Sequence, residues 1–84
     1  MTGARVAVDS AAVWPEDTDE DEGVVSNWFV REGARIEEGD VVCEIQVEKV
    51  SVDVPAPATG ELDEIAHGEG DEFRRGDALA WVTT

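Results

Sequence analysis

Lys49 is the side chain best suited to covalent chemistry, because it is the only lysine among 84 residues. The other five basic residues are arginines. A lysine amine can be acylated to an amide, whereas a guanidinium stays protonated and practically cannot. The pattern therefore favours a covalent role for Lys49, although a genome that avoids lysine would leave a similar composition.

The other reactive side chains form no catalytic or metal-binding pattern. His67 has no second imidazole or cysteine pair near it, so we expect it in a surface turn rather than as a ligand. Cys43 is the only cysteine, which rules out an internal disulfide, and we expect it to fill a small space in the core. Gly68-Glu69-Gly70 is too short for a nucleotide-binding fingerprint. We therefore expect no catalytic residue and no metal.

The charge balance narrows the classes of partner. The formal net charge is −15, which disfavours contact with nucleic acid or an anionic membrane. No apolar run is long enough to cross a bilayer, and the N-terminus has no secretory pattern. We expect a cytoplasmic protein that meets a basic partner surface, with adaptation to high salt as another explanation of the acidity.

The strand pattern around Lys49 predicts a tight hairpin. Apolar residues occupy odd positions over 43–47 and even positions over 50–54. A continuous strand keeps its phase, so the slip indicates a two-residue loop at Glu48-Lys49. The loop would pair Val47 with Val50, Ile45 with Val52 and Cys43 with Val54 on one buried face. Because Glu-Lys is not a favoured turn sequence, a bulge within one longer strand is the alternative.

An internal repeat places this hairpin between two halves of the chain. Gly23, Gly33 and Gly39 recur 37 residues later as Gly60, Gly70 and Gly76. The matching apolar positions are Val25 with Leu62, Trp28 with Ile65, Ile36 with Phe73, Val42 with Leu79, and Ile45 with Val82. Each half is expected to form a strand, a glycine turn, a short strand, a Gly-Asp turn and a further strand. This predicts an all-β fold of two facing sheets with quasi-two-fold symmetry.

The first half carries an insertion of nine residues. An edge strand is expected at 5–8, equivalent to a strand at 50–54 before the second half. Between the first strand and Gly23, residues 16–22 are almost all acidic, so about 9–22 should form a solvated surface loop. We expect Trp14 to anchor this loop to the barrel, with a partner-binding role as the alternative.

From about Glu22 to Val82 the sequence resembles the biotinyl/lipoyl attachment domain family. The densest similarity lies at 39–50 and at 54–60. The match is strongest to the lipoyl domains of 2-oxoacid dehydrogenase acyltransferases, which typically show Glu-Thr-Asp-Lys where this chain has Gln46-Val47-Glu48-Lys49. The resemblance implies a flattened barrel-sandwich of two antiparallel four-stranded sheets, with residues 1–84 as a single carrier domain that is not itself an enzyme.

The resemblance also implies a function and a site. Lys49 would carry lipoic acid as a swinging arm for acyl transfer, with Glu48 and Val50 as recognition neighbours. The implied partners are a lipoylating enzyme, a thiamine-dependent decarboxylase, an acyltransferase core and dihydrolipoyl dehydrogenase, and the isolated domain is expected to be monomeric. Biotin carriers normally flank their lysine with methionine, but the only methionine here is Met1. A biotin carboxyl carrier and an unmodified adaptor module are the alternatives.

Three features depart from the pattern of lipoyl domains. Gln46 and Val47 stand where the family usually has Glu and Thr. Val8-Asp9 stand where Met-Pro often follows the first strand. The following loop is unusually acidic, and in lipoyl domains it lies near the hairpin and helps the decarboxylase to recognise its carrier. By this resemblance, residues 9–22 would influence the choice of partner.

Overall fold

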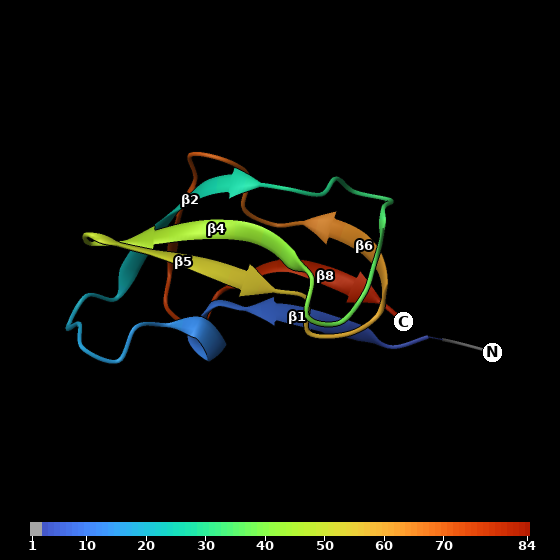
Figure 1. The fold of residues 1–84 in the computed structure, drawn as a ribbon, viewed down its shortest axis with the longest axis horizontal. Coiled ribbons are helices and arrows are strands. Elements are labelled where there is room, and N and C mark those ends of the chain that lie inside the picture. The colour runs from blue at the N-terminus through green and yellow to red at the C-terminus, as the bar shows by residue number, and fades with distance from the viewer. Residues whose placement is uncertain (1–2) are drawn as a thin grey trace.

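The structure, a computed structural model, describes residues 3–84. Within them the elements in chain order are β1 (Arg5–Asp9), η1 (Ser10–Val13), β2 (Glu22–Trp28), β3 (Arg35–Ile36), β4 (Val41–Val47), β5 (Val50–Pro55), β6 (Gly60–Ile65), β7 (Glu72–Arg74) and β8 (Ala78–Thr83). Two antiparallel four-stranded sheets lie face to face, one in the order β1-β8-β6-β3 and the other in the order β5-β4-β2-β7 (Figure 1). No helix in the described part is long and apolar enough to cross a membrane.

The two sheets are related as the repeat predicts. Replacing β1, β8, β6 and β3 by β5, β4, β2 and β7 converts one strand order into the other. The main-chain hydrogen bonds are also reciprocal: Gly33 N donates to Leu62 O at 2.7 Å, and Gly70 N donates to Val25 O at 2.8 Å. The flattened all-β sandwich with quasi-two-fold symmetry is therefore confirmed, including edge strands at both predicted positions.

The two Gly-Asp turns have the same local design. Gly39 and Gly76 adopt φ of 93° and 96°, a left-handed conformation in which a Cβ is strained. The carboxylates of Asp40 and Asp77 each accept a hydrogen bond from the amide three residues earlier, at 3.0 and 2.9 Å. Side chain and backbone therefore close each turn together, which explains why this dipeptide recurs in the sequence.

A buried serine marks where the two halves differ. Gly39 N donates to the carbonyl of Ala56 at 3.0 Å. In the other half, Gly76 N donates instead to Ser10 Oγ at 2.9 Å, and this hydroxyl lies 3.3 Å from its acceptor Arg74 O. Ser10 is fully buried, and these two bonds satisfy its hydroxyl. The inserted segment thus begins inside the barrel, not in solvent.

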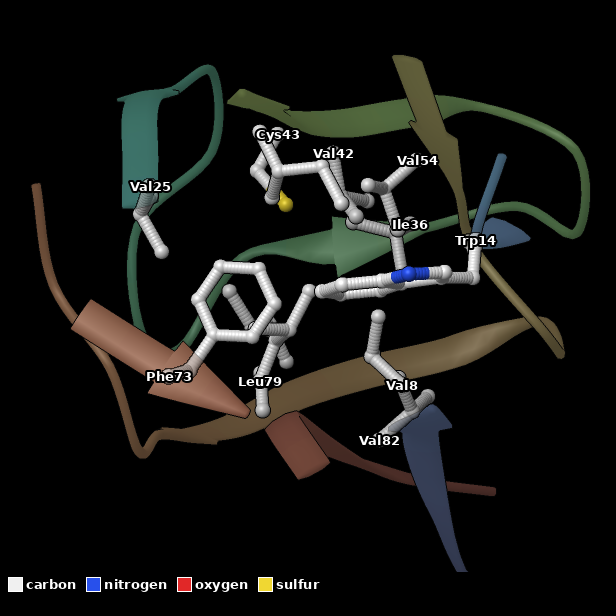
Figure 2. Close-up of a cluster of buried hydrophobic side chains, with 14 of the residues drawn as sticks. Val8, Trp14, Val25, Ile36, Val42, Cys43, Val54, Phe73, Leu79 and Val82 are labelled. Carbon is white, nitrogen blue, oxygen red and sulfur yellow. The ribbon is translucent and has the colours of Figure 1, made fainter. Parts of the chain in front are cut away.

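The core fills the space between the sheets and includes Trp14 of the inserted segment. Figure 2 shows the Trp14 indole among the aliphatic side chains of both sheets, close to Phe73. Trp14 is 8% exposed, and its ring meets the Phe73 ring edge-to-face at a centroid distance of 5.9 Å. The predicted anchoring of the loop by Trp14 is confirmed.

The inserted loop is shorter than the expected range of about 9–22. Asp9 is the last residue of β1, and its Oδ1 caps η1 by accepting a hydrogen bond from Ala11 N at 2.9 Å. Glu22 is the first residue of β2, where it pairs with Arg74 of β7. Glu22 is therefore part of a sheet, whereas the run of like charges had predicted that it belongs to the loop. The acidic side chains of the run, that of Glu22 included, are nevertheless exposed.

Candidate cofactor attachment site

Lys49 lies in the two-residue turn between β4 and β5. The strands pair Val47 with Val50, Ile45 with Val52 and Cys43 with Val54. This register is the predicted one, and the alternative of a bulge at Lys49 is wrong: the register shift in this strand pair falls between Val41 and Cys43, at the far end. Lys49 is exposed, and Val47 directly before the turn is fully buried. The lysine is thus displayed from a strand that is fixed in the core.

One part of the hairpin prediction is wrong. The predicted buried face holds for Val47, Ile45, Cys43 and Val54, whereas Val52 is partly buried and Val50 is 46% exposed. The hairpin projects past the end of the opposite sheet (Figure 1). Val50 is exposed there, although its partner Val47 is fully buried. Val50 is consequently available for recognition, as is Glu48 on the other side of the lysine.

Glu48 has an unusual backbone. Its φ is 55°, and it is the only residue other than glycine with a positive φ between residues 3 and 84. A Cβ makes this left-handed conformation unfavourable, because it brings the side chain close to the following carbonyl. The conformation lets a two-residue loop join β4 and β5 directly. The strain of the turn therefore falls on the residue next to Lys49.

Two hydrogen bonds hold Glu48 in place. The amide Nε2 of Gln46 donates to the main-chain oxygen of Glu48 at 3.1 Å. The hydroxyl of Thr18, from the inserted loop, donates to Glu48 Oε1 at 2.6 Å. The loop and the lysine hairpin are therefore in direct contact, although 30 residues separate these partners.

Further contacts fix the loop to the barrel. Trp14 Nε1 donates to Glu20 O at 2.9 Å, and the Arg75 guanidinium lies 5.8 Å from the centre of the Trp14 ring. Arg75 also forms a salt bridge with Asp21, and its amide donates to Asp21 O at 2.8 Å. Thr18 thus sits in a segment whose two flanks are attached to the core and to Arg75, the residue that follows β7.

The surface beside the hairpin is strongly acidic. A hollow of about 400 Å³ adjoins the turn, with Val24 exposed in its lining. Four glutamates also line it: Glu20, Glu22, Glu48 and Glu72. Of these, Glu22 is partly neutralised by Arg74, whose Nη2 lies 3.4 Å from its carboxylate, and Lys49 makes no salt bridge to any residue that the structure describes. This surface favours a positively charged partner and repels nucleic acid.

The other candidate side chains lie away from the turn. His67 is partly buried beside the Phe73 ring, with its Nε2 3.9 Å from Asp77. Cys43 is fully buried as predicted, and desolvation by burial raises the pKa of its thiol from 9.0 to about 12. Across residues 3–84 no three His, Cys, Asp or Glu side chains converge as a metal site would require.

Thr18 is the residue of the site that sequence reasoning missed. It lies within the acidic run and matches no spacing rule, so only the folded loop brings it to Glu48. The sequence already showed Gln46 as a departure from the pattern of lipoyl domains. In the structure this residue donates a hydrogen bond to the main-chain oxygen of Glu48. Glu48, Lys49 and Val50 lie together at the tip as predicted.

The molecule is elongated, measuring 42 × 19 × 18 Å, and the lysine hairpin projects at one end. Thr84 N donates to Ala4 O at 2.9 Å, so the two ends of the described chain lie together, and Figure 1 shows them opposite the hairpin. The fold and site define a small β-sandwich that displays a single lysine on a fixed turn, far from the two ends of the described chain.

Comparison with known proteins identifies the family. Residues 17–82 match the biotin/lipoyl family model, described as biotin-requiring enzyme. The chain belongs to this family of biotinyl/lipoyl attachment domains, which carry a cofactor and are not themselves catalytic. The predicted family is therefore confirmed.

The individual relatives include proteins that are named for a dihydrolipoyllysine residue. The chain is 40% identical over 61 residues to the dihydrolipoyllysine-residue acetyltransferase component of the pyruvate dehydrogenase complex of Staphylococcus aureus, and 38% identical to that of Staphylococcus epidermidis. These matches cover 73% of this chain and 14% of each relative. The chain is thus comparable to a small part of these proteins.

Solved structures agree on the fold. The lipoyl domain of the 2-oxoglutarate dehydrogenase complex from Azotobacter vinelandii superposes with a TM-score of 0.65 at 25% identity, covering 100% of this chain and 96% of that one. The urea carboxylase of Kluyveromyces lactis superposes with a TM-score of 0.66 at 27% identity, covering 82% of this chain and 6% of that one. Both chains contain the same sandwich.

Proposed function

We propose that residues 1–84 form one lipoyl carrier domain, in which Lys49 is the attachment residue and Glu48 and Val50 are its recognition neighbours. The observation that carries this proposal is the position of the only lysine at the exposed tip of a hairpin whose register is fixed in the core. Relatives named for a dihydrolipoyllysine residue support lipoic acid over biotin as the cargo.

The residues around Lys49 fit an amide-linked cofactor. The amine must enter the active site of another enzyme, which requires an exposed side chain on a support that keeps its shape. Lys49 is exposed, forms no salt bridge within the described chain, and follows a strand that ends at the buried Val47. Lipoic acid, when bound, supplies a disulfide that can accept and release an acyl group, while the domain orients and displays it.

The family and the relatives named as components of the pyruvate dehydrogenase complex suggest the set of partners. A lipoylating enzyme would load Lys49, and the loaded domain would visit a thiamine-dependent decarboxylase, an acyltransferase core and dihydrolipoyl dehydrogenase. The acidic hollow beside the turn would favour basic surfaces on these partners. We expect the isolated domain to be a monomer in the cytoplasm.

Intact mass spectrometry tests the cargo. The purified chain is incubated with a lipoate-attaching enzyme, lipoic acid and ATP, and separately with a biotin-attaching enzyme, biotin and ATP. A gain of one lipoyl group that disappears in Lys49→Arg supports the proposal, and the arginine keeps the positive charge as a matched control. A gain of the mass of biotin would assign the chain to carboxyl transfer. No gain in mass with either enzyme would refute both carrier functions and favour an unmodified adaptor module.

A further inference from the structure

The bonds to Glu48 come from different parts of the chain and act on both ends of one residue. Gln46 holds its main-chain oxygen, and Thr18 holds its carboxylate. We propose that Thr18 and Gln46 are positioning residues, which hold Glu48 in its left-handed conformation and thereby set how Lys49 is presented to the enzyme that modifies it. This proposal rests on the proposed function of Lys49 as an attachment residue.

Gln46 contributes a donor that the residue usual in lipoyl domains would lack. Its side chain lies on the exposed face of β4, two residues before the carbonyl that it binds. An ionised glutamate has only acceptor oxygens, so it could not donate to this carbonyl and would place negative charge against it. Gln46 therefore fits a turn whose first residue, Glu48, is strained.

Thr18 is oriented to donate toward the hairpin. Its hydroxyl oxygen accepts a hydrogen bond from Glu20 N at 3.0 Å, which directs the hydroxyl proton to another partner. That partner is Glu48 Oε1 at 2.6 Å, a short distance typical of a hydroxyl bound to a carboxylate. The buried Trp14 in turn binds the main-chain oxygen of Glu20. These hydrogen bonds therefore connect the core, through the inserted loop, to the turn that carries Lys49.

The conformation of the turn should be sensitive to the loss of a single hydrogen bond. The penalty for a left-handed residue with a Cβ and the net gain from one hydrogen bond are of similar size. The two-residue loop between the paired strands itself favours a positive φ at Glu48, and the two bonds add to that preference. Loss of either bond should therefore let a larger fraction of molecules leave the left-handed conformation. A change in φ at residue 48 rotates Lys49 relative to β4, so those molecules would present the amine in another direction.

The test compares the rate of lipoylation with the conformation of the turn. Thr18→Val and Gln46→Met remove each donor at nearly constant volume, and Thr18→Ser keeps the hydroxyl as a matched control. We expect the kcat/KM of a lipoate-attaching enzyme to fall about threefold to tenfold for either donor-free variant and to stay within about twofold for Thr18→Ser. The amide–Hα coupling of residue 48, measured by NMR, should shift in the same two variants only.

A glycine background separates positioning from direct recognition. Glycine takes a positive φ without penalty, so in a Glu48→Gly chain the further change Gln46→Met should alter the rate by less than about twofold. The proposal is overturned if the donor-free variants are modified at the wild-type rate, or if they are slowed with an unchanged coupling at residue 48. Failure of the wild-type chain to be lipoylated would instead refute the proposed function, and the coupling would still decide whether Thr18 and Gln46 hold the turn.

Discussion

Replacement of Trp14 by alanine should destabilise the whole domain, although Trp14 belongs to an acidic inserted segment. The side chain is 8% exposed, and a buried aromatic residue removes about 150–250 Å² from water. At about 25 cal/mol per Å² this corresponds to about 4–6 kcal/mol, of which alanine retains a small part. We therefore expect Trp14→Ala to lower the free energy of unfolding by about 3–5 kcal/mol. The total for a chain of this size is about 4–13 kcal/mol.

Trp14→Phe separates the ring from its hydrogen bond. Phenylalanine can keep the edge-to-face contact with Phe73 but loses the bond from Nε1 to Glu20 O, so we expect a cost of about 1–2 kcal/mol. Trp81→Phe serves as the control, because this ring is only partly buried under the Arg5 guanidinium and should cost less than about 1 kcal/mol. The measurement is urea unfolding followed by the fluorescence of the remaining tryptophans.

Two outcomes would refute this reasoning. A cost below about 1 kcal/mol for Trp14→Ala would show that the indole is not part of the core. Equal costs for the alanine and phenylalanine variants would show that the hydrogen bond, not burial of the ring, anchors the loop. If the reasoning holds, proteolysis within residues 16–21 should also become faster in Trp14→Ala, because the loop loses its attachment.

Two further predictions concern the core and the sheets. The pKa of the Cys43 thiol is about 12 in the folded chain and near 9 when unfolded, so the folded state holds this proton more tightly and stability should fall by up to about 1.4 kcal/mol per pH unit between those values. Unfolding curves at rising pH should lose this slope in Cys43→Ala, and the native thiol should resist a thiol reagent at pH 8. Gly60→Ala should cost about 3 kcal/mol or more, because the new Cβ would lie 2.2 Å from the main-chain oxygen of Thr83. Gly23→Ala should cost about 1–2 kcal/mol, because its Cβ would lie 2.9 Å from the end of the Phe73 side chain, and a side chain yields more easily than main chain. Urea unfolding measures both costs, and equal destabilisation by Gly60→Ala and Gly23→Ala would contradict this prediction.

The sequence by itself determined the fold and the position of Lys49. Side chains alternate between the faces of a strand, so the phase slip between Val47 and Val50 could only be reconciled by a turn or a bulge, and the structure has the turn. The glycine repeat showed in the same way that the two halves of the chain have the same order of strands and turns. A left-handed turn restricts which residue can stand there, and that restriction is visible in the sequence at Gly39 and Gly76.

Tertiary structure alone decided how the inserted loop meets the hairpin. No periodicity places Thr18 beside Glu48, because the contact depends on the path of a loop attached through Trp14 and Arg75. Composition indicated only that the loop is acidic and solvated, and it gave no sign that Ser10 enters the core. Hydrogen bonds between segments 30 residues apart depend on three-dimensional positions, whereas turns and strand phase depend on neighbours in the chain. The lysine was therefore found from the sequence, and the residues that hold its turn were found only from the fold.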